Sequence, residues 1–224
     1  ILAADTVIYD GDYRCIFDSN GHLVTGWYYV KDLHYPGYGD WCYSDEDGHL
    51  VTGWKIIGGA WYYFSPEIGS MRSSIYTEID GYMYCFGDDG RMITGWKYID
   101  DSFFDEINDK WYYFESNGHQ CDPGWKKING IWYYFDTNGS MKTGWFKDGN
   151  TWYYFNAGGA MVTGWLKEGN TWYYMNDNGA MATGWKLISG VWYYFENNGS
   201  MVTGSKTLNG KNYEFDSNGH CTNP

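Results

Sequence analysis

Paired tryptophans are the residues of this sequence whose type and spacing could do chemistry. In the regular part of the chain the two members lie seven residues apart, as in Trp145 and Trp152 or Trp165 and Trp172, and a methionine follows nine residues after the second. A quaternary ammonium ion has no hydrogen-bond donor, so proteins hold it with aromatic faces, at about 0.5 to 2 kcal/mol for each contact. A thioether can complete the floor of such a cage. The same rings could also stack on a sugar, so the pattern alone leaves two ligand classes open.

The tryptophan pairs belong to a repeat of about 20 residues. The segment that begins at Gly124, GWKKINGIWYYFDTNGSMKTGW, returns in the same frame at Trp145, Trp165 and Trp185. In front of Gly124 the frame is less regular, but the last position of the box WYYF can be followed through ten units. That position holds Phe17, Ser44, Phe64, Phe86, Phe114, Phe135, Phe155, Met175, Phe195 and Phe215.

Each unit has the sequence signals of a β-hairpin. The box Trp-Tyr-Tyr-Phe consists of residues that favour strands, and turn dipeptides such as Asn129-Gly130 or Gly149-Asn150 precede it. A second glycine follows each box and links one hairpin to the next. Because a lone hairpin is only marginally stable, neighbouring hairpins must stack and bury one another's aromatic faces. The sequence therefore predicts an all-β solenoid of about ten stacked hairpins.

The units are irregular at the front of the chain and regular at the back. Two long insertions, at 28–40 and 97–110, fall at hairpin tips in units two and five. Unit four has Ile75 and Met83 in place of its tryptophans, and unit ten has Ser205 and Asn212, so neither is expected to form a site. We predict one continuous solenoid with degenerate repeats at 1–124 and regular repeats at 125–224.

Composition excludes several classes of function. The formal net charge is −13 and no basic patch occurs, which argues against nucleic-acid binding. No run of 18 apolar residues predicts a transmembrane helix. The five cysteines contain no CxxC motif, so neither a zinc module nor a disulfide scaffold is implied. The first residues, Ile1-Leu2, are neither Met nor a charged leader, and we expect a mature or trimmed product.

Catalysis and metal binding are not expected. No Gly-x-Ser-x-Gly, HExxH or Walker motif occurs, and repeats take up every segment long enough for a catalytic domain. We therefore predict a protein that is not an enzyme and has no cofactor. Four of the five histidines follow a turn glycine and are spread along the chain, so no metal site is expected. The acidic residues of the second long tip are expected to form a solvated loop; they are Asp100, Asp101, Asp105, Glu106 and Asp109.

The frame G-W-x6-W-Y-Y-F-x3-G-x-M-x-T-G-W resembles the choline-binding repeat of Gram-positive surface proteins and lysins. The resemblance extends from Tyr13 to the end of the chain and is strongest over 124–204. A chain made only of such repeats is similar to the small pneumococcal choline-binding surface proteins. The resemblance implies a left-handed superhelix with about three repeats per turn. It would place the two long tips on the same side.

The resemblance also implies how the cages are assembled. Each cage takes both tryptophans of one hairpin and the first tyrosine of the next box, with the following methionine beside it. Four complete cages are Trp125, Trp132 and Tyr153 with Met141; Trp145, Trp152 and Tyr173 with Met161; Trp165, Trp172 and Tyr193 with Met181; and Trp185, Trp192 and Tyr213 with Met201. Three altered cages are Trp54, Trp61 and Tyr84 with Met71; Trp27, Trp41 and Tyr62 with Leu50; and Trp96, Trp111 and Tyr133 with Cys121.

The function implied is attachment to the wall of a Gram-positive bacterium after secretion. The partner would be choline or phosphocholine on teichoic and lipoteichoic acids, with the phosphate left in solvent. A first alternative is a carbohydrate-binding (glucan) module, whose repeats share the Tyr-Tyr-Phe and Gly-Trp frame but generally lack the first Trp of the box. A second is an adhesin or a regulator of wall hydrolases, which would bind a host or wall-enzyme protein with its front half.

Overall fold

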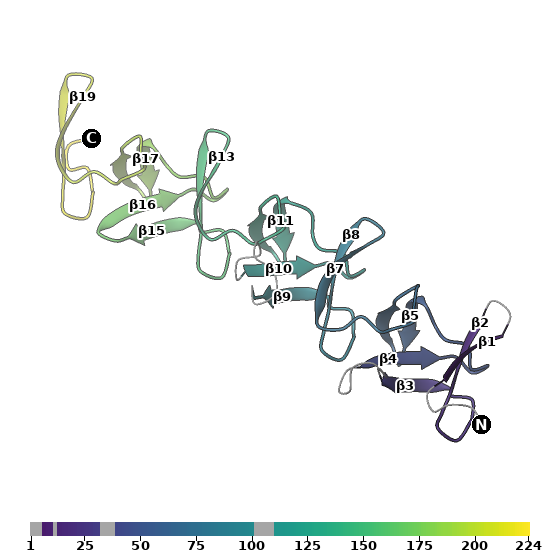
Figure 1. Cartoon of the computed structure of the whole chain (residues 1–224). Coiled ribbons are helices and arrows are strands. Elements are labelled where there is room, and N and C mark those ends of the chain that lie inside the picture. The colour runs from purple at the N-terminus through teal and green to yellow at the C-terminus, as the bar shows by residue number, and fades with distance from the viewer. Residues whose placement is uncertain (1–5, 11–12, 32–38, 101–109) are drawn as a thin grey trace. The chain divides into compact units, whose positions relative to one another are not determined.

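The structure, a computed structural model, describes residues 6–10, 13–31, 39–100 and 110–224 (Figure 1). All regular secondary structure in these residues is β, and no helix there is long and apolar enough to cross a membrane. The strands are β1 (Thr6–Asp10), β2 (Tyr13–Phe17), β3 (Gly26–Lys31), β4 (Gly39–Ser44), β5 (Gly53–Ile57), β6 (Ala60–Phe64), β7 (Ile75–Ile79), β8 (Tyr82–Phe86), β9 (Gly95–Ile99), β10 (Lys110–Phe114), β11 (Gly124–Ile128), β12 (Ile131–Phe135), β13 (Gly144–Asp148), β14 (Thr151–Phe155), β15 (Gly164–Glu168), β16 (Thr171–Met175), β17 (Gly184–Ile188), β18 (Val191–Phe195), β19 (Gly204–Leu208) and β20 (Lys211–Phe215).

Consecutive strands pair into antiparallel hairpins, ten of them in the described residues. The predicted turn dipeptides lie at the hairpin tips. Asn129 and Gly130 both have positive φ, 49° and 86°, as a type I′ turn requires. In the next hairpin only the first turn residue has positive φ: Gly149 has a φ of 58°, and the φ of Asn150 is not positive. These turns match the right-handed twist of the two strands they join. The prediction of an all-β chain of repeated hairpins is confirmed.

The core is built from the last residue of each second strand. Phe155, Met175 and Phe195 have no exposed surface. The first tryptophan of the preceding hairpin lies against such a ring, as Trp125 does with Phe155 at 5.5 Å between centroids. The box phenylalanines therefore form the core, together with first box tyrosines such as Tyr193, which is 8% exposed. The second box tyrosines, such as Tyr174, are only partly buried.

The chain divides into two compact units, Ile1–Cys121 and Asp122–Pro224. Within the second unit, β13 and β19 stand upright in the view of Figure 1, whereas β15 and β16 run across it. Hairpins three apart thus point the same way, as about three repeats per turn would require. In the first unit the hairpins β3–β4 and β9–β10 also share a direction in this view. The ends of the two long tips, 32–38 and 101–109, lie outside the described residues, and so do four of the five acidic residues predicted to be solvated.

Candidate functional site: repeated aromatic cages

The cage on β15 and β16 shows how the repeat positions its rings. Trp165 and Trp172 lie on one face of the hairpin, with centroids 6.1 Å apart and ring planes at 89°. Tyr193 of β18 closes the third side, 4.9 Å from Trp165. Both tryptophans are exposed, at 38% and 40%, whereas Tyr193 is buried. The rings line a cavity of about 310 Å³ that is open to solvent. Two perpendicular indoles and a phenol form the kind of corner that holds a cation without hydrogen-bond donors.

The same corner recurs in both units. Six of the seven predicted groups have their two tryptophans and their tyrosine together, with indole centroids 6.1–6.5 Å apart, ring planes at 82–89°, and the tyrosine 4.7–5.0 Å from the first tryptophan. They are Trp27, Trp41 and Tyr62; Trp54, Trp61 and Tyr84; Trp125, Trp132 and Tyr153; Trp145, Trp152 and Tyr173; Trp165, Trp172 and Tyr193; and Trp185, Trp192 and Tyr213.

The residues of the seventh predicted group are divided between the two units. Trp96 on β9 and Trp111 on β10 occupy the register positions of the other tryptophan pairs, opposite Tyr113 and Tyr98. Tyr133 belongs to the second unit, so this cage stays a prediction.

At the two cages whose cavities are described, the lining methionine differs from the predicted residue. The cavity between Trp165 and Trp172 is lined by Met201, not by Met181, and the cavity between Trp27 and Trp41 is lined by Met71, not by Leu50. The predicted partners were one repeat too early.

Backbone hydrogen bonds give the reason for this shift. After each hairpin the turn folds back onto the hairpin before it, and the N–H of its methionine donates to the carbonyl of the second cage tryptophan there. Thus Met201 donates to Trp172 at 2.8 Å. The other bonds of this series run from Met161 to Trp132, Met181 to Trp152, Cys221 to Trp192, Met71 to Trp41 and Met92 to Trp61. The corrected partners of Trp125, Trp145, Trp165, Trp185, Trp27 and Trp54 are therefore Met161, Met181, Met201, Cys221, Met71 and Met92.

Unit four was misaligned by one residue. In the strand register Tyr76, not Ile75, lies opposite the box residue Cys85, as Trp54 lies opposite Tyr63. Tyr76 packs against Tyr112 at 5.6 Å between centroids, and its hydroxyl donates to the Oε1 atom of Gln120. The backbone N–H of Gln120 in turn donates to the carbonyl of Met83. Unit four thus has a degenerate corner of tyrosine and methionine that a glutamine closes with a hydrogen bond.

Polar residues at the cage rims were missed by sequence reasoning. Each of the two cavities is also lined by the turn that follows the hairpin two units later. In the cavity of Trp27 and Trp41 these turn residues are Asp88 and Asp89. In the cavity of Trp165 and Trp172 they are Ser217 and Asn218. The residue after the turn glycine lies against the cage tyrosine: the Nε of Arg91 donates to the Tyr62 hydroxyl at 3.3 Å, and the His220 ring lies 5.5 Å from Tyr193. Only the 20-residue period, counted over two units, could have revealed these neighbours.

Burial affects the ionisation of the cage tyrosines. It raises the pKa of Tyr84, with smaller effects from Asp80 and Tyr82. It also raises the pKa of Tyr193, where the carboxylate of Asp216 adds to the effect. Both phenols therefore stay neutral at physiological pH, so neither adds a formal charge to its cage.

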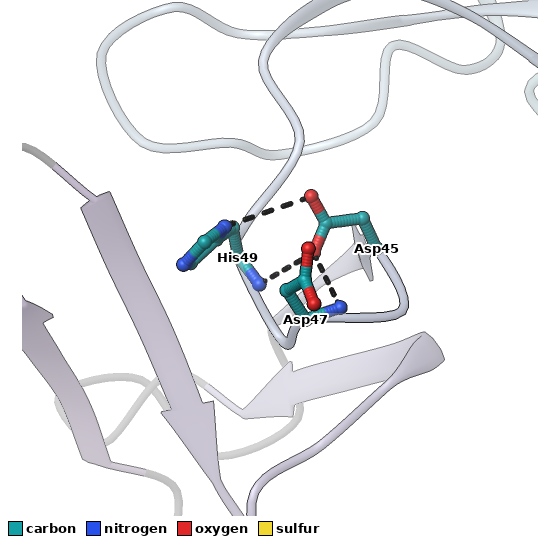
Figure 2. A group of neighbouring side chains, drawn as sticks. All are labelled: Asp45, Asp47 and His49. Atoms are coloured by element: carbon teal, nitrogen blue, oxygen red, sulfur yellow. Dashed lines mark hydrogen bonds and ion pairs between the residues drawn. The ribbon is translucent and has the colours of Figure 1, made fainter.

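One cluster in the described residues has the composition of a metal site. Asp45, Asp47 and His49 bring their ligand atoms within 4.8 Å of one another (Figure 2). Asp45 Oδ1 accepts the backbone N–H groups of Asp47 at 3.1 Å and of His49 at 2.8 Å. Asp216 makes the same bonds to Asn218 and His220 in the last turn. Because this arrangement recurs in the turns, we assign the cluster to turn formation.

Comparisons with known proteins agree with the repeat and its fold. The choline-binding repeat family matches residues 123–163, 147–184 and 182–221, and the cell wall binding repeat family matches 52–66 and 105–119. The solved structure of CbpJ from Streptococcus pneumoniae TIGR4 is 29% identical with a TM-score of 0.79, over 97% of this chain and 87% of that one.

Two further pneumococcal structures are similar. Choline binding protein F, solved in the presence of a peptidoglycan analogue, is 28% identical with a TM-score of 0.65, over 98% of this chain and 93% of that one. The choline-binding domain of CbpL is 30% identical with a TM-score of 0.54, over 77% of this chain and 87% of that one. A search of curated proteins found no match.

Proposed function

Because the chain belongs to the choline-binding repeat family, we propose that it is a non-catalytic protein that attaches to phosphocholine on teichoic and lipoteichoic acids. Choline-binding repeat proteins are associated with the cell wall of Gram-positive bacteria, and we infer that this chain is secreted to that surface. Its ligand would be the quaternary ammonium group, held between the two tryptophans and the tyrosine of each cage.

One observation carries this proposal: the perpendicular tryptophan pair with its tyrosine recurs six times with almost the same dimensions. A packing role alone would bury these indoles, yet Trp41, Trp61 and Trp192 are 47%, 43% and 40% exposed. A single open cage should bind weakly, at about 1 mM or −4 kcal/mol. Several cages on one polymer of choline would gain a factor of roughly 10² to 10⁴ by avidity.

A titration with choline chloride, followed by tryptophan fluorescence, tests the proposal. We expect a saturable change that shrinks in the double variant Trp145→Ala and Trp165→Ala, which removes one wall from each of two cages. The matched control is Ile68→Ala, because this side chain is 60% exposed and belongs to none of the seven predicted cages. If choline has no effect on the wild-type protein, the proposal is wrong.

The carbohydrate alternative has an observation of its own. A polar groove of about 600 Å³ lies between the hairpins β15–β16 and β17–β18, lined among others by Tyr174, Asn176, Asp177 and Lys186. A ring face with amides, a carboxylate and an amine around it is suited to a sugar. Dextran is therefore titrated in parallel. A response to dextran without one to choline would favour the glucan-binding function.

The adhesin or regulator alternative concerns the front half of the chain. The ends of its two long tips lie outside the described residues, so this function is kept as a proposal that can coexist with choline binding. Removal of 32–38 and 101–109 from the full chain would test it, because choline binding should persist while binding to any host or wall-enzyme partner is lost.

A further inference from the structure

Three lysines of the second unit stand beside the cages. Each lies directly opposite the second cage tryptophan of its own hairpin in the strand register. The Nζ atoms of Lys127, Lys147 and Lys167 are 5.7, 5.9 and 5.6 Å from the ring centroids of Trp132, Trp152 and Trp172.

The strand geometry places these ammonium groups at the cage rim. Each lysine follows the first cage tryptophan by two residues, and side chains two apart on a strand project from the same face. Lys167 therefore shares a face with Trp165 and, across the hairpin, with Trp172. Its flexible four-carbon stem lets the ammonium group move over this rim.

A lysine at this place works against binding of choline alone. Its ammonium group occupies the π face of a cage tryptophan, and it repels a second cation that enters the same corner. Phosphocholine differs from choline because its phosphate is joined to the quaternary nitrogen by only two carbons. When the nitrogen sits between the rings, the phosphate must lie near the rim, where an ammonium group can pair with it.

We propose that Lys127, Lys147 and Lys167 form phosphate subsites, so that these three cages select phosphocholine over free choline. This inference rests on the proposed function and changes our expectation that the phosphate is left in solvent. It also sets three cages apart from the others. The cage of Trp185 and Trp192 has Leu187 in the lysine position, and that of Trp54 and Trp61 has Ile56.

A carboxylate lies near each of the three subsites. Asp148 accepts a hydrogen bond from the indole N–H of Trp125 at 2.9 Å. Glu168 is hydrogen-bonded to Tyr154, the residue opposite Trp145. Ile188 takes the equivalent position beside Trp165. The carboxylate near the third cage is instead Asp216, which acts on Tyr193. Since a carboxylate repels phosphate, each of the three lysines must offset such a repulsion.

The test compares phosphocholine with choline chloride by calorimetric titration of the full-length protein. The variant carries Lys127→Met, Lys147→Met and Lys167→Met, since methionine keeps an unbranched stem over each indole. We expect the wild-type preference for phosphocholine to fall by about two- to fivefold, the range for one exposed ion pair. Choline itself should bind slightly more tightly to the variant, and added NaCl should weaken the wild-type preference.

One control variant and two contrary results separate the explanations. Leu187→Lys in the wild-type chain should raise the preference for phosphocholine by adding a fourth subsite. If the triple variant loses affinity for both ligands by the same factor, the lysines only pack on the indoles and the inference is wrong. If neither ligand binds the wild-type protein, it is the choline-binding proposal that fails.

Discussion

At the residue scale, the aromatic rings of the cages could be predicted from the sequence, but the methionine beside each cage could not. The resemblance to the choline-binding repeat implied which two tryptophans and which tyrosine share a cage, and the strict period carried this pattern from unit to unit. Six of the predicted groups have their three rings together. The methionines were assigned one repeat too early because each is closer along the chain to the wrong tryptophan. The sequence does not say that a turn folds back onto the preceding hairpin, and a hydrogen bond such as that from Met201 to Trp172 decides it.

Two buried serines allow a prediction at this scale. Ser44 fills a box position that is phenylalanine in most units, and its Oγ has no hydrogen-bond partner among the described residues, although the residue is only 1% exposed. Ser140 is fully buried too, but its Oγ donates to Asp136 Oδ2 at 2.9 Å. An unpaired buried hydroxyl costs stability, whereas a paired one contributes to it.

We therefore expect opposite effects of the same substitution. Ser44→Ala should raise the free energy of unfolding by about 1 kcal/mol, and Ser140→Ala should lower it by about 1 kcal/mol. Urea unfolding followed by tryptophan fluorescence measures both. Equal destabilisation by the two variants would contradict the assignment of Ser44 as unpaired.

At the element scale, hairpins were predictable from their turn dipeptides, while unit four was not aligned correctly. In most units the first strand begins at a glycine with positive φ, such as Gly53. In unit four the strand begins at Ile75, and the positive φ of 48° belongs to the residue before it, Ser74. Without a glycine at this place the first tryptophan position could be assigned to Ile75 or to Tyr76, and unit four contains no tryptophan to decide between them. Only the pairing of Tyr76 with Cys85 fixes the register.

Stacking between hairpins depends on one glycine per turn. Gly179 has a φ of +80°, and a Cβ atom there would lie 2.2 Å from the Sδ of Met161. Gly184 has a similar φ of +72°, but open space around it. Alanine should strain the backbone at both positions, at a cost of about 1–2 kcal/mol. At Gly179 it should also displace the methionine beside Trp132.

Comparing Gly179→Ala with Gly184→Ala separates the clash with Met161 from the backbone strain that both variants share. Gly179→Ala should lower the free energy of unfolding by about 1–3 kcal/mol more than Gly184→Ala, the usual cost of overpacking. It should also weaken choline binding, because Met161 lies at the rim of a cage. Calorimetric titration and urea unfolding of both variants check the two effects. Equal losses would mean that Met161 moves aside at no cost.

At the scale of the whole molecule, the period of 20 predicts a chain of hairpins and places three cysteines at box positions, where they are buried thiols. The first unit replaces box tyrosines with cysteines, and Cys42 and Cys85 are each only 4% exposed. Burial, with a smaller effect of Asp40 at Cys42, raises the pKa of both thiols to about 11. It also raises the pKa of Tyr76.

These raised pKa values predict sensitivity to alkali. In the unfolded chain a cysteine ionises near its usual pKa of about 8.5, whereas the folded thiols hold their protons up to about pH 11. The unfolded state therefore releases protons first as the pH rises. Below about pH 8 the folded state suffers no loss of stability from these groups, and between about pH 9 and 11 its free energy of unfolding should fall.

Urea unfolding of the full chain at pH 7, 8.5, 9.5 and 10.5 measures this fall. The double variant Cys42→Ala and Cys85→Ala should be less stable at pH 7, because each substitution leaves a small cavity, yet its stability should decline less between pH 8.5 and 10.5. Cys221→Ala is the matched control, since that thiol is only partly buried at the last turn. A decline as steep in the double variant as in the wild type would mean that other groups, Tyr76 among them, cause the alkaline transition.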